Sequence, residues 1–279
     1  MTTGAAAGQL GARSHSFRHF VQVTRALTTT EFKLRYFDSV LGYLWTLLRP
    51  LMLFGVLYLV FTHIVRFGDA VPHYPVMLLA AIVVFNFFSE ATSGGLGSLV
   101  VRENLLRKVS FPRAAVPISV SMTSAANLGL GIIVVFGFAI VDGVTPSWGW
   151  FGFLACVAGA IVLATATAVL LSVLYVQFRD AQPIWEVGLQ LLFWGTPIIY
   201  TIEATDSLAD WVGKVMMCNP LAVVIQQGRH WLSESSTVSA SEAIGSTALL
   251  LVPLAISVLV VVASVLLFRK KAPRIAEEL

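Results

Sequence analysis

Five long apolar stretches and one interrupted one constrain this chain more than any other feature of its sequence. Each is long enough to cross a hydrocarbon core of about 30 Å as an α-helix, which rises about 1.5 Å per residue. Hydrophobic residues make up 57% of the chain and charged residues only 12%, so a water-soluble fold could not bury this much apolar surface. We therefore predict an all-α membrane protein with six transmembrane helices, at residues 44–65, 75–99, 116–141, 150–176, 184–200 and 246–268.

The lysines and arginines predict the orientation of these helices. Cytoplasmic segments of membrane proteins carry an excess of basic residues. If the N-terminus is cytoplasmic, 15 of the 18 basic residues lie inside, and only Arg66, Lys214 and Arg229 lie outside. The sequence thus predicts a multi-pass protein of a bacterial inner membrane with both termini in the cytoplasm. The net charge of +3 could suggest a nucleic-acid partner, but the basic residues lie beside apolar stretches. Membrane topology explains them better.

The segments between the apolar stretches predict three further helices. Residues 17–45 show apolar side chains at helical spacing with a polar face, which is typical of a helix along the cytoplasmic interface. Residues 206–218 and 221–232 form two short amphipathic segments on the outer side that dip into the outer leaflet or lie on it, the second beginning with Asn219 as N-cap and Pro220. We predict an N-terminal tail and interface helix at 1–43, a six-span domain at 44–268 and a cytoplasmic tail at 269–279.

No constellation for chemical catalysis is visible in the sequence. A phosphate-binding Gly-x-x-x-x-Gly-Lys-Ser/Thr loop and a dinucleotide-binding Gly-x-Gly-x-x-Gly turn are both absent. The histidines are scattered, and none pairs with a carboxylate at metal-ligand spacing. We predict a protein that is not an enzyme and that holds neither a metal nor a nucleotide.

Polar residues inside the apolar stretches recur at helical spacing. Asn86 and Glu90 share one face of the second stretch, and Glu186 and Gln190 share one face of the fifth. Such faces point to a pathway through the protein, because lipid cannot satisfy polar groups; the alternative is close helix packing. Two interpretations of the nearby aromatic side chains are open. They would suit a sugar pathway, because the C–H faces of sugars stack on rings, or they face lipid or lie in interfacial belts. The candidate pathway residues are Tyr58, Asn86, Phe87, Glu90, Gln190, Phe193 and Trp194.

The loop after the second stretch combines charge with apolar side chains. The preference of cytoplasmic loops for basic residues explains its arginines and lysine, but not the leucines and phenylalanine between them. A short helix that docks into a cytoplasmic partner explains both. The candidate docking residues are Arg102, Glu103, Asn104, Leu105, Leu106, Arg107, Lys108, Phe111, Pro112 and Arg113.

Five sets of residues, in order along the chain, resemble one transporter family. The chain is similar to the ABC-2 permeases of polysaccharide exporters, of the Wzm and teichoic-acid-exporter type. It departs from their pattern at Phe37, where a second basic residue is expected. The resemblance covers residues 30–270 and rests on Lys33-Leu-Arg-Tyr-Phe-Asp-Ser-Val-Leu-Gly-Tyr-Leu-Trp45 with Arg49-Pro50, Asn104 with Phe111-Pro112-Arg113 and Pro117, Phe178-Arg179-Asp180, Pro197-Ile-Ile-Tyr200, and Asn219-Pro220-Leu221.

The resemblance implies a homodimeric exporter subunit that works with two copies of a separate ATPase, on which ATP and magnesium would be bound. Its cargo would be a lipid-linked polysaccharide such as O-antigen or cell-wall galactan. Residues 102–113 would couple to the ATPase. The cytoplasmic gate helix, at residues 17–39, would include Lys33, Arg35, Tyr36 and Phe37, and the outer gate helices would include Trp211, Asn219 and Pro220.

Other functions stay open at this point. An ABC-2 exporter of drugs or small lipids would share the same sequence features. An ion-coupled carrier would use Glu90 or Glu186 as its proton site, although carriers often show inverted repeats or broken helices in corresponding halves, and neither is found in this sequence. A membrane scaffold would not need polar faces in several spans.

Overall fold

The computed structural model describes the backbone of residues 3–36, 44–66, 71–108, 112–202, 210–233 and 237–272. Within these ranges, side chains are described except at residues 3–17, 35–36, 107–108 and 210. The described residues form helices joined by short connections and contain no β-strand. The all-α prediction is therefore confirmed.

Among the described residues, five helices are long and apolar enough to cross a membrane. Each lies within a few residues of a stretch predicted from the sequence, so five of the six predicted spans are confirmed as long apolar helices. They are α2 (Leu44–Leu59), which continues as a π-helix (Val60–Ile64), α3 (Tyr74–Val101), α5 (Ala115–Val141), α6 (Gly149–Gln177) and α11 (Leu251–Lys271), which follows the 3-10 helix Thr247–Leu250.

The fifth predicted span differs from the prediction. Helix α7 (Ala181–Gly195) has 15 residues and is therefore about 22 Å long, which is short of a hydrocarbon core of about 30 Å. It ends because Pro197 disfavours helical backbone at the residue before it, and Thr196 is extended, with φ −109° and ψ 137°. The prediction of a transmembrane helix over residues 184–200 is wrong in its last five residues: residues 196–200 form a non-helical segment whose Ile198 and Ile199 are buried.

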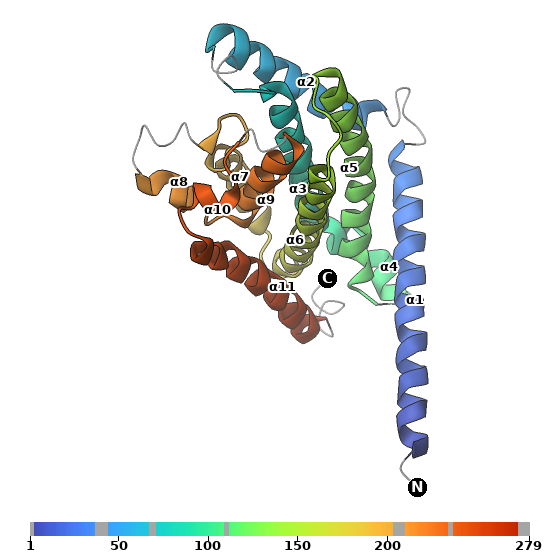
Figure 1. Ribbon diagram of the computed structural model, residues 1–279. Helices are drawn as coiled ribbons and strands as arrows, with labels where there is room; N and C mark the ends of the chain where they lie inside the picture. The colour runs from blue at the N-terminus through green and yellow to red at the C-terminus, as the bar shows by residue number, and fades with distance from the viewer. Residues whose placement is uncertain are drawn as a thin grey trace.

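Helix α3 forms the centre of the bundle, between α5 and α6 (Figure 1). It is buried along most of its length, whereas α2 and α11 have few buried residues. A small residue permits its contact with α6: a Cβ at Gly95 would lie 2.5 Å from the Cβ of Ala168. Since carbon atoms pack at about 3.5–4.0 Å, the two backbones approach closely only because residue 95 is glycine.

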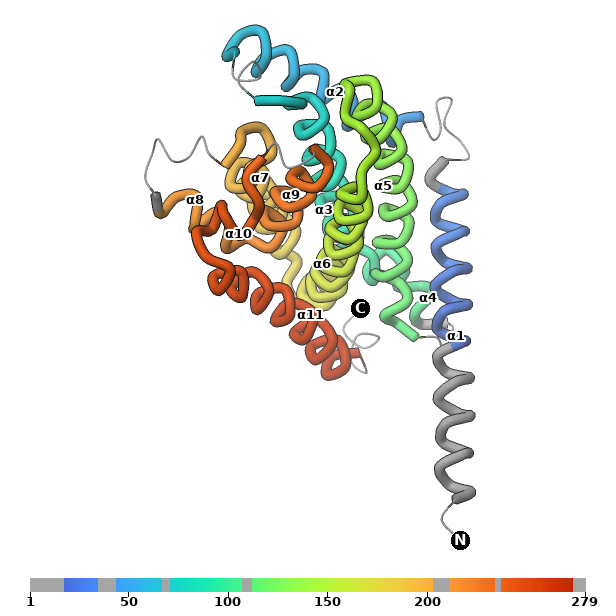
Figure 2. The backbone as a smooth tube through the Cα atoms, viewed as in Figure 1, coloured from blue at the N-terminus to red at the C-terminus, as the bar shows by residue number. Residues whose placement is uncertain are grey.

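Helix α1 (Thr3–Tyr36) lies along the side of α5 (Figures 1 and 2). The short helices are α4 (Glu103–Lys108), α8 (Asp210–Met216), α9 (Pro220–Leu232) and α10 (Ala240–Ala243). The sequence predicts that residues 221–232 dip into the outer leaflet or lie on it. Helix α9 packs on α6 and α3 and has seven buried residues, so it is part of the bundle.

Candidate functional site

A pocket of about 840 Å³ opens between α2, α3 and α5. It lies near the middle of α3 and α5, and the first half of α2 forms its third wall. Polar side chains from all three helices contribute to the lining. The residues that line it are Trp45, Thr46, Leu47, Arg49, Pro50, Met52, Val83, Asn86, Phe87, Ser89, Glu90, Ser93, Gly94, Ser124, Asn127, Leu128 and Gly131.

The polar groups of α3 and α5 meet in this pocket. The Asn127 side chain donates a hydrogen bond to the Glu90 carboxylate, with 3.2 Å between Nδ2 and Oε1. Asn86 lies one turn before Glu90 on the same face of α3. Ser124 is fully buried, and its hydroxyl has no hydrogen-bond partner among the described residues. The amide side chains of Asn86 and Asn127 carry both donors and acceptors, so a ligand with hydroxyl groups would find both in this pocket.

The structure brings together only some of the candidate pathway residues. Asn86, Phe87 and Glu90 line the pocket. Tyr58 stacks on Phe54 of its own helix, with ring centroids 5.7 Å apart, and does not line it. The remaining three candidates lie on α7 and do not line it either: Gln190 and Trp194 are exposed, and Phe193 packs edge-on against Phe85 at 5.2 Å.

The predicted docking loop forms α4, which follows α3 after one turn residue, Arg102. Leu106 is only 6% exposed and packs with Leu99 and Val116. Asn104 and Leu105 are exposed. The structure therefore offers Leu105, and not Leu106, to a partner.

The rest of the docking loop is described in part. Arg107 and Lys108 belong to α4, but their side chains lie outside the described residues, as does all of Phe111. At the end of the loop, the Pro112 carbonyl accepts a hydrogen bond from the Ala115 amide. The Arg113 guanidinium donates to the carbonyl of Ala272, which follows α11. These contacts connect the loop to the ends of α5 and α11.

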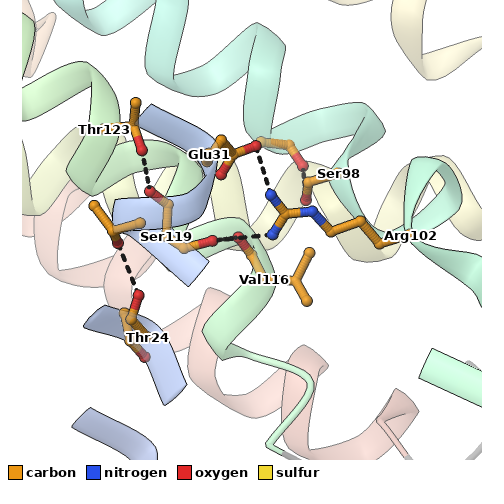
Figure 3. Close-up of polar contacts among 9 residues, drawn as sticks. Thr24, Glu31, Ser98, Arg102, Val116, Ser119 and Thr123 are labelled. Atoms are coloured by element: carbon orange, nitrogen blue, oxygen red, sulfur yellow. Dashed lines mark hydrogen bonds and ion pairs between the residues drawn. The ribbon is translucent and has the colours of Figure 1, made fainter. Parts of the chain in front are cut away.

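An ion pair joins the predicted gate helix to the predicted docking loop, and no sequence pattern indicated it. Glu31 of α1 accepts a hydrogen bond from Arg102, with 2.7 Å between Oε1 and Nη2 (Figure 3). No periodicity could reveal a contact between residues so far apart in the chain. Of the gate residues, Lys33 is exposed, Arg35 and Tyr36 lie in α1 without described side chains, and Phe37 lies outside the described residues.

A buried arginine holds together the end of the bundle at which α7 stops. Arg229 of α9, which the predicted topology assigns to the outer side of the membrane, is 3% exposed. Its guanidinium donates to the carbonyls of Met77 and Tyr200, at 3.2 Å each, and to those of Pro197 and Ile198. It thus satisfies the carbonyls of the non-helical segment after α7, which water or a helix would otherwise have to satisfy.

The predicted outer gate residues, Trp211, Asn219 and Pro220, differ in how they contact the rest of the protein. Asn219 caps α9 as predicted: its side-chain oxygen accepts from the Leu221 amide at 3.0 Å, and its nitrogen donates to the Thr196 hydroxyl at 3.0 Å. Pro220 is the first residue of α9. Trp211 of α8 is 66% exposed. The cap therefore connects α9 to the end of α7.

Comparison with known proteins places this architecture in a family. Residues 22–231 match the model of the ABC-2 type transporter family. Two proteins of Klebsiella pneumoniae, both named O-antigen export system permease protein RfbA, are 29% and 28% identical over 204 and 205 residues, which cover 73% of this chain and 77% of each relative. A protein of the same name from Myxococcus xanthus is 32% identical over 178 residues, covering 64% of this chain and 68% of the relative. The chain therefore belongs to the ABC-2 type transporter family and is a multi-pass protein of the inner membrane.

Proposed function

We propose that this chain is the permease subunit of an ABC exporter that moves a lipid-linked polysaccharide across the inner membrane. The observation that carries the proposal is its similarity to three O-antigen export permeases over most of the chain. An exporter of drugs or small lipids has no comparable support among these relatives.

The pocket between α2, α3 and α5 is our candidate for part of the sugar pathway. Asn86 and Asn127 each carry both a donor and an acceptor, and the Glu90 carboxylate accepts. Phe87 also contributes to the wall of the pocket, although it is only 3% exposed. Polar side chains of this kind bind each sugar weakly, which lets a polymer move past them.

A second copy of the chain would complete the pathway. Gln182, Glu186 and Gln190 are exposed at intervals of four residues on α7, and the Gln182 amide donates to the Glu186 carboxylate at 3.1 Å. Lipid cannot satisfy this polar face, so we assign it to the interface with the second copy or to the pathway beside it. In this arrangement α7 and residues 196–202 form the fifth of six crossings, and both termini are cytoplasmic.

A separate ATPase subunit, in two copies, would supply the energy and carry the ATP and magnesium. Helix α4 is the proposed docking element, with Asn104 and Leu105 as its exposed contacts and Leu106 as its anchor to the bundle. Helix α1 is the proposed cytoplasmic gate, and α8 and α9 are the proposed outer gate.

Depletion of the chain in its own cell tests the proposed function. We expect surface polysaccharide to fall, lipid-linked polymer to accumulate in the inner membrane, and expression of the chain to reverse both effects. Surface polysaccharide at the normal level, with retention of a drug or small lipid instead, would favour the alternative exporter.

Glu90→Gln separates an ATP-driven exporter from an ion-coupled carrier, because it removes the charge and keeps the size and hydrogen bonding of the side chain. We expect this variant to retain most of its polysaccharide export. Complete loss of export, together with normal insertion and dependence of the parental rate on the proton gradient, would favour the carrier.

A further inference from the structure

Arg102 occupies the junction between α3 and α4. It is the C-terminal cap of α3, and its carbonyl accepts hydrogen bonds from the Leu105 and Leu106 amides at 3.0 Å each. The first turn of α4 is therefore built on the backbone of Arg102. Any displacement of α4 must move this residue.

The Arg102 side chain extends from that junction to two other helices (Figure 3). Besides the Glu31 carboxylate of α1, its guanidinium reaches the Ser119 hydroxyl of α5 at 3.3 Å. The Ser119 hydroxyl donates to the Val116 carbonyl at 2.7 Å, so its oxygen is oriented to accept from Arg102. The position of the guanidinium that contacts Glu31 is consequently fixed by the backbone at the end of α3 and by Ser119 of α5.

Partial burial favours this ion pair. The Arg102 and Glu31 side chains are 19% and 21% exposed, so water screens their attraction less than it would at an open surface. Glu31 Oε1 receives the contact, whereas Oε2 is buried and has no hydrogen-bond partner among the described residues. The free oxygen is a second acceptor onto which the guanidinium can shift if α4 moves.

An apolar contact accompanies the polar one. Leu27 of α1, one turn before Glu31, packs against the cluster that holds Leu106 of α4 together with Leu99 and Val116. Helix α1 thus contacts Arg102 at the junction through a charged residue, and the apolar cluster that includes Leu106 of α4 through an apolar residue one turn earlier. Together, these two contacts define the orientation of α1 relative to the junction as well as its distance from it.

We propose that Arg102 is a positioning residue that links α1 to α4, so that displacement of α4 by the ATPase subunit moves the gate helix. The proposal rests on the proposed function, because it needs an ATPase at α4. It assigns to Glu31, which no sequence pattern singled out, the role of receiving the motion on α1.

Charge exchange between the two residues tests the link in cells that carry the ATPase subunit. We expect Glu31→Arg and Arg102→Glu each to lower polysaccharide export at least about tenfold, and the double exchange to restore it to within about threefold of the parental rate, because the exchange restores the attraction. Thr30→Arg is the matched control, since it adds the same charge to α1 at a neighbouring exposed position.

Two further measurements separate a link from a structural defect. In the complex purified with its ATPase subunit, we expect the Glu31→Arg variant, which lies outside the predicted docking loop, to keep hydrolysing ATP while export falls. In lipid nanodiscs without the ATPase, amide hydrogen exchange over residues 20–34 should rise at least about tenfold in each single variant and return in the double exchange.

The outcomes are distinct. Parental export in both single variants, or no recovery in the double exchange when all variants insert equally, would overturn the link. Unchanged hydrogen exchange in α1 would also overturn it, whatever the cargo is. If the parental chain supports no polysaccharide export, the proposed function fails, and the nanodisc measurement still decides whether Arg102 positions α1.

Discussion

Replacing Gly95 by alanine tests the packing of the central helix. The new Cβ would lie 2.5 Å from the Cβ of Ala168 and 3.1 Å from its Cα, so the first contact is about 1–1.5 Å shorter than carbon atoms allow. The nearest atoms belong to the backbone and to a side chain without rotamers, so only a shift of α3 against α6 relieves the clash. Overpacking of this kind costs about 1–3 kcal/mol. We therefore expect the unfolding equilibrium to shift toward the unfolded state by a factor of about 5 to 150.

Equilibrium unfolding of the purified chain in mixed micelles of increasing SDS content measures this shift. Gly97→Ala is the matched control, because a Cβ at that position would meet no neighbouring group within 4 Å, and we expect unchanged or higher stability. Combining Gly95→Ala with Ala168→Gly removes the shortest contact and should recover most of the loss. If Gly95→Ala and Gly97→Ala unfold alike, the close approach of α3 and α6 does not limit stability and the reasoning is refuted.

Three further predictions concern orientation, Arg229 and the docking helix. In a cysteine-free background, an impermeant thiol reagent should label a cysteine at Asp142 from outside and one at Asn104 only from inside; the reverse pattern would invert the topology. Arg229→Lys should lower the melting temperature, because an ammonium cannot match the guanidinium fork and each charge-assisted hydrogen bond lost costs about 1.5–3 kcal/mol; unchanged melting would contradict this. Leu106→Ser should destabilise the chain by about 1.5–3 kcal/mol, whereas Leu105→Ser should keep its stability and lower export; equal effects on stability would show that α4 does not face the bundle as described.

Hydropathy and helical periodicity predicted most of the architecture. Apolar side chains in long runs can be satisfied only by lipid or by one another, so the positions of α2, α3, α5, α6 and α11 follow from composition alone. Periodicity also placed Asn86 and Glu90 on one face of α3, and this face lines the pocket. Both signals are local, which is why they can be read without knowledge of the fold.

The end of α7 was missed although the sequence contains its cause. Residues 184–200 are mostly apolar, and hydropathy cannot distinguish a helix from buried non-helical backbone. The Gly195-Thr196-Pro197 sequence carries the missing information, because proline disfavours helical backbone at the residue before it. If this local steric effect is given more weight than the length of the apolar stretch, the predicted helix ends before Pro197, as it does in the structure.

Contacts between distant segments could not be predicted from the sequence. Glu31 and Arg102 are paired by the packing of α1 beside α5, which no periodicity records. The order of the predicted spans assigned Arg229 to an outer segment but could not show its burial, which depends on carbonyl groups contributed by residues before it in the chain. In the same way, the apolar character of Leu106 was read as a docking signal, but only the fold shows that it faces the bundle.

The arginine of α9 has a consequence for truncated forms of this protein. Arg229 follows α7 and the non-helical segment in the chain, and it supplies hydrogen-bond donors to carbonyls of that segment. Hydrocarbon does not accommodate such carbonyls unless they are satisfied. A chain truncated before residue 229 would keep α7 and lack the donors that this segment needs, so we expect it to fail to pack residues 196–200 into the bundle.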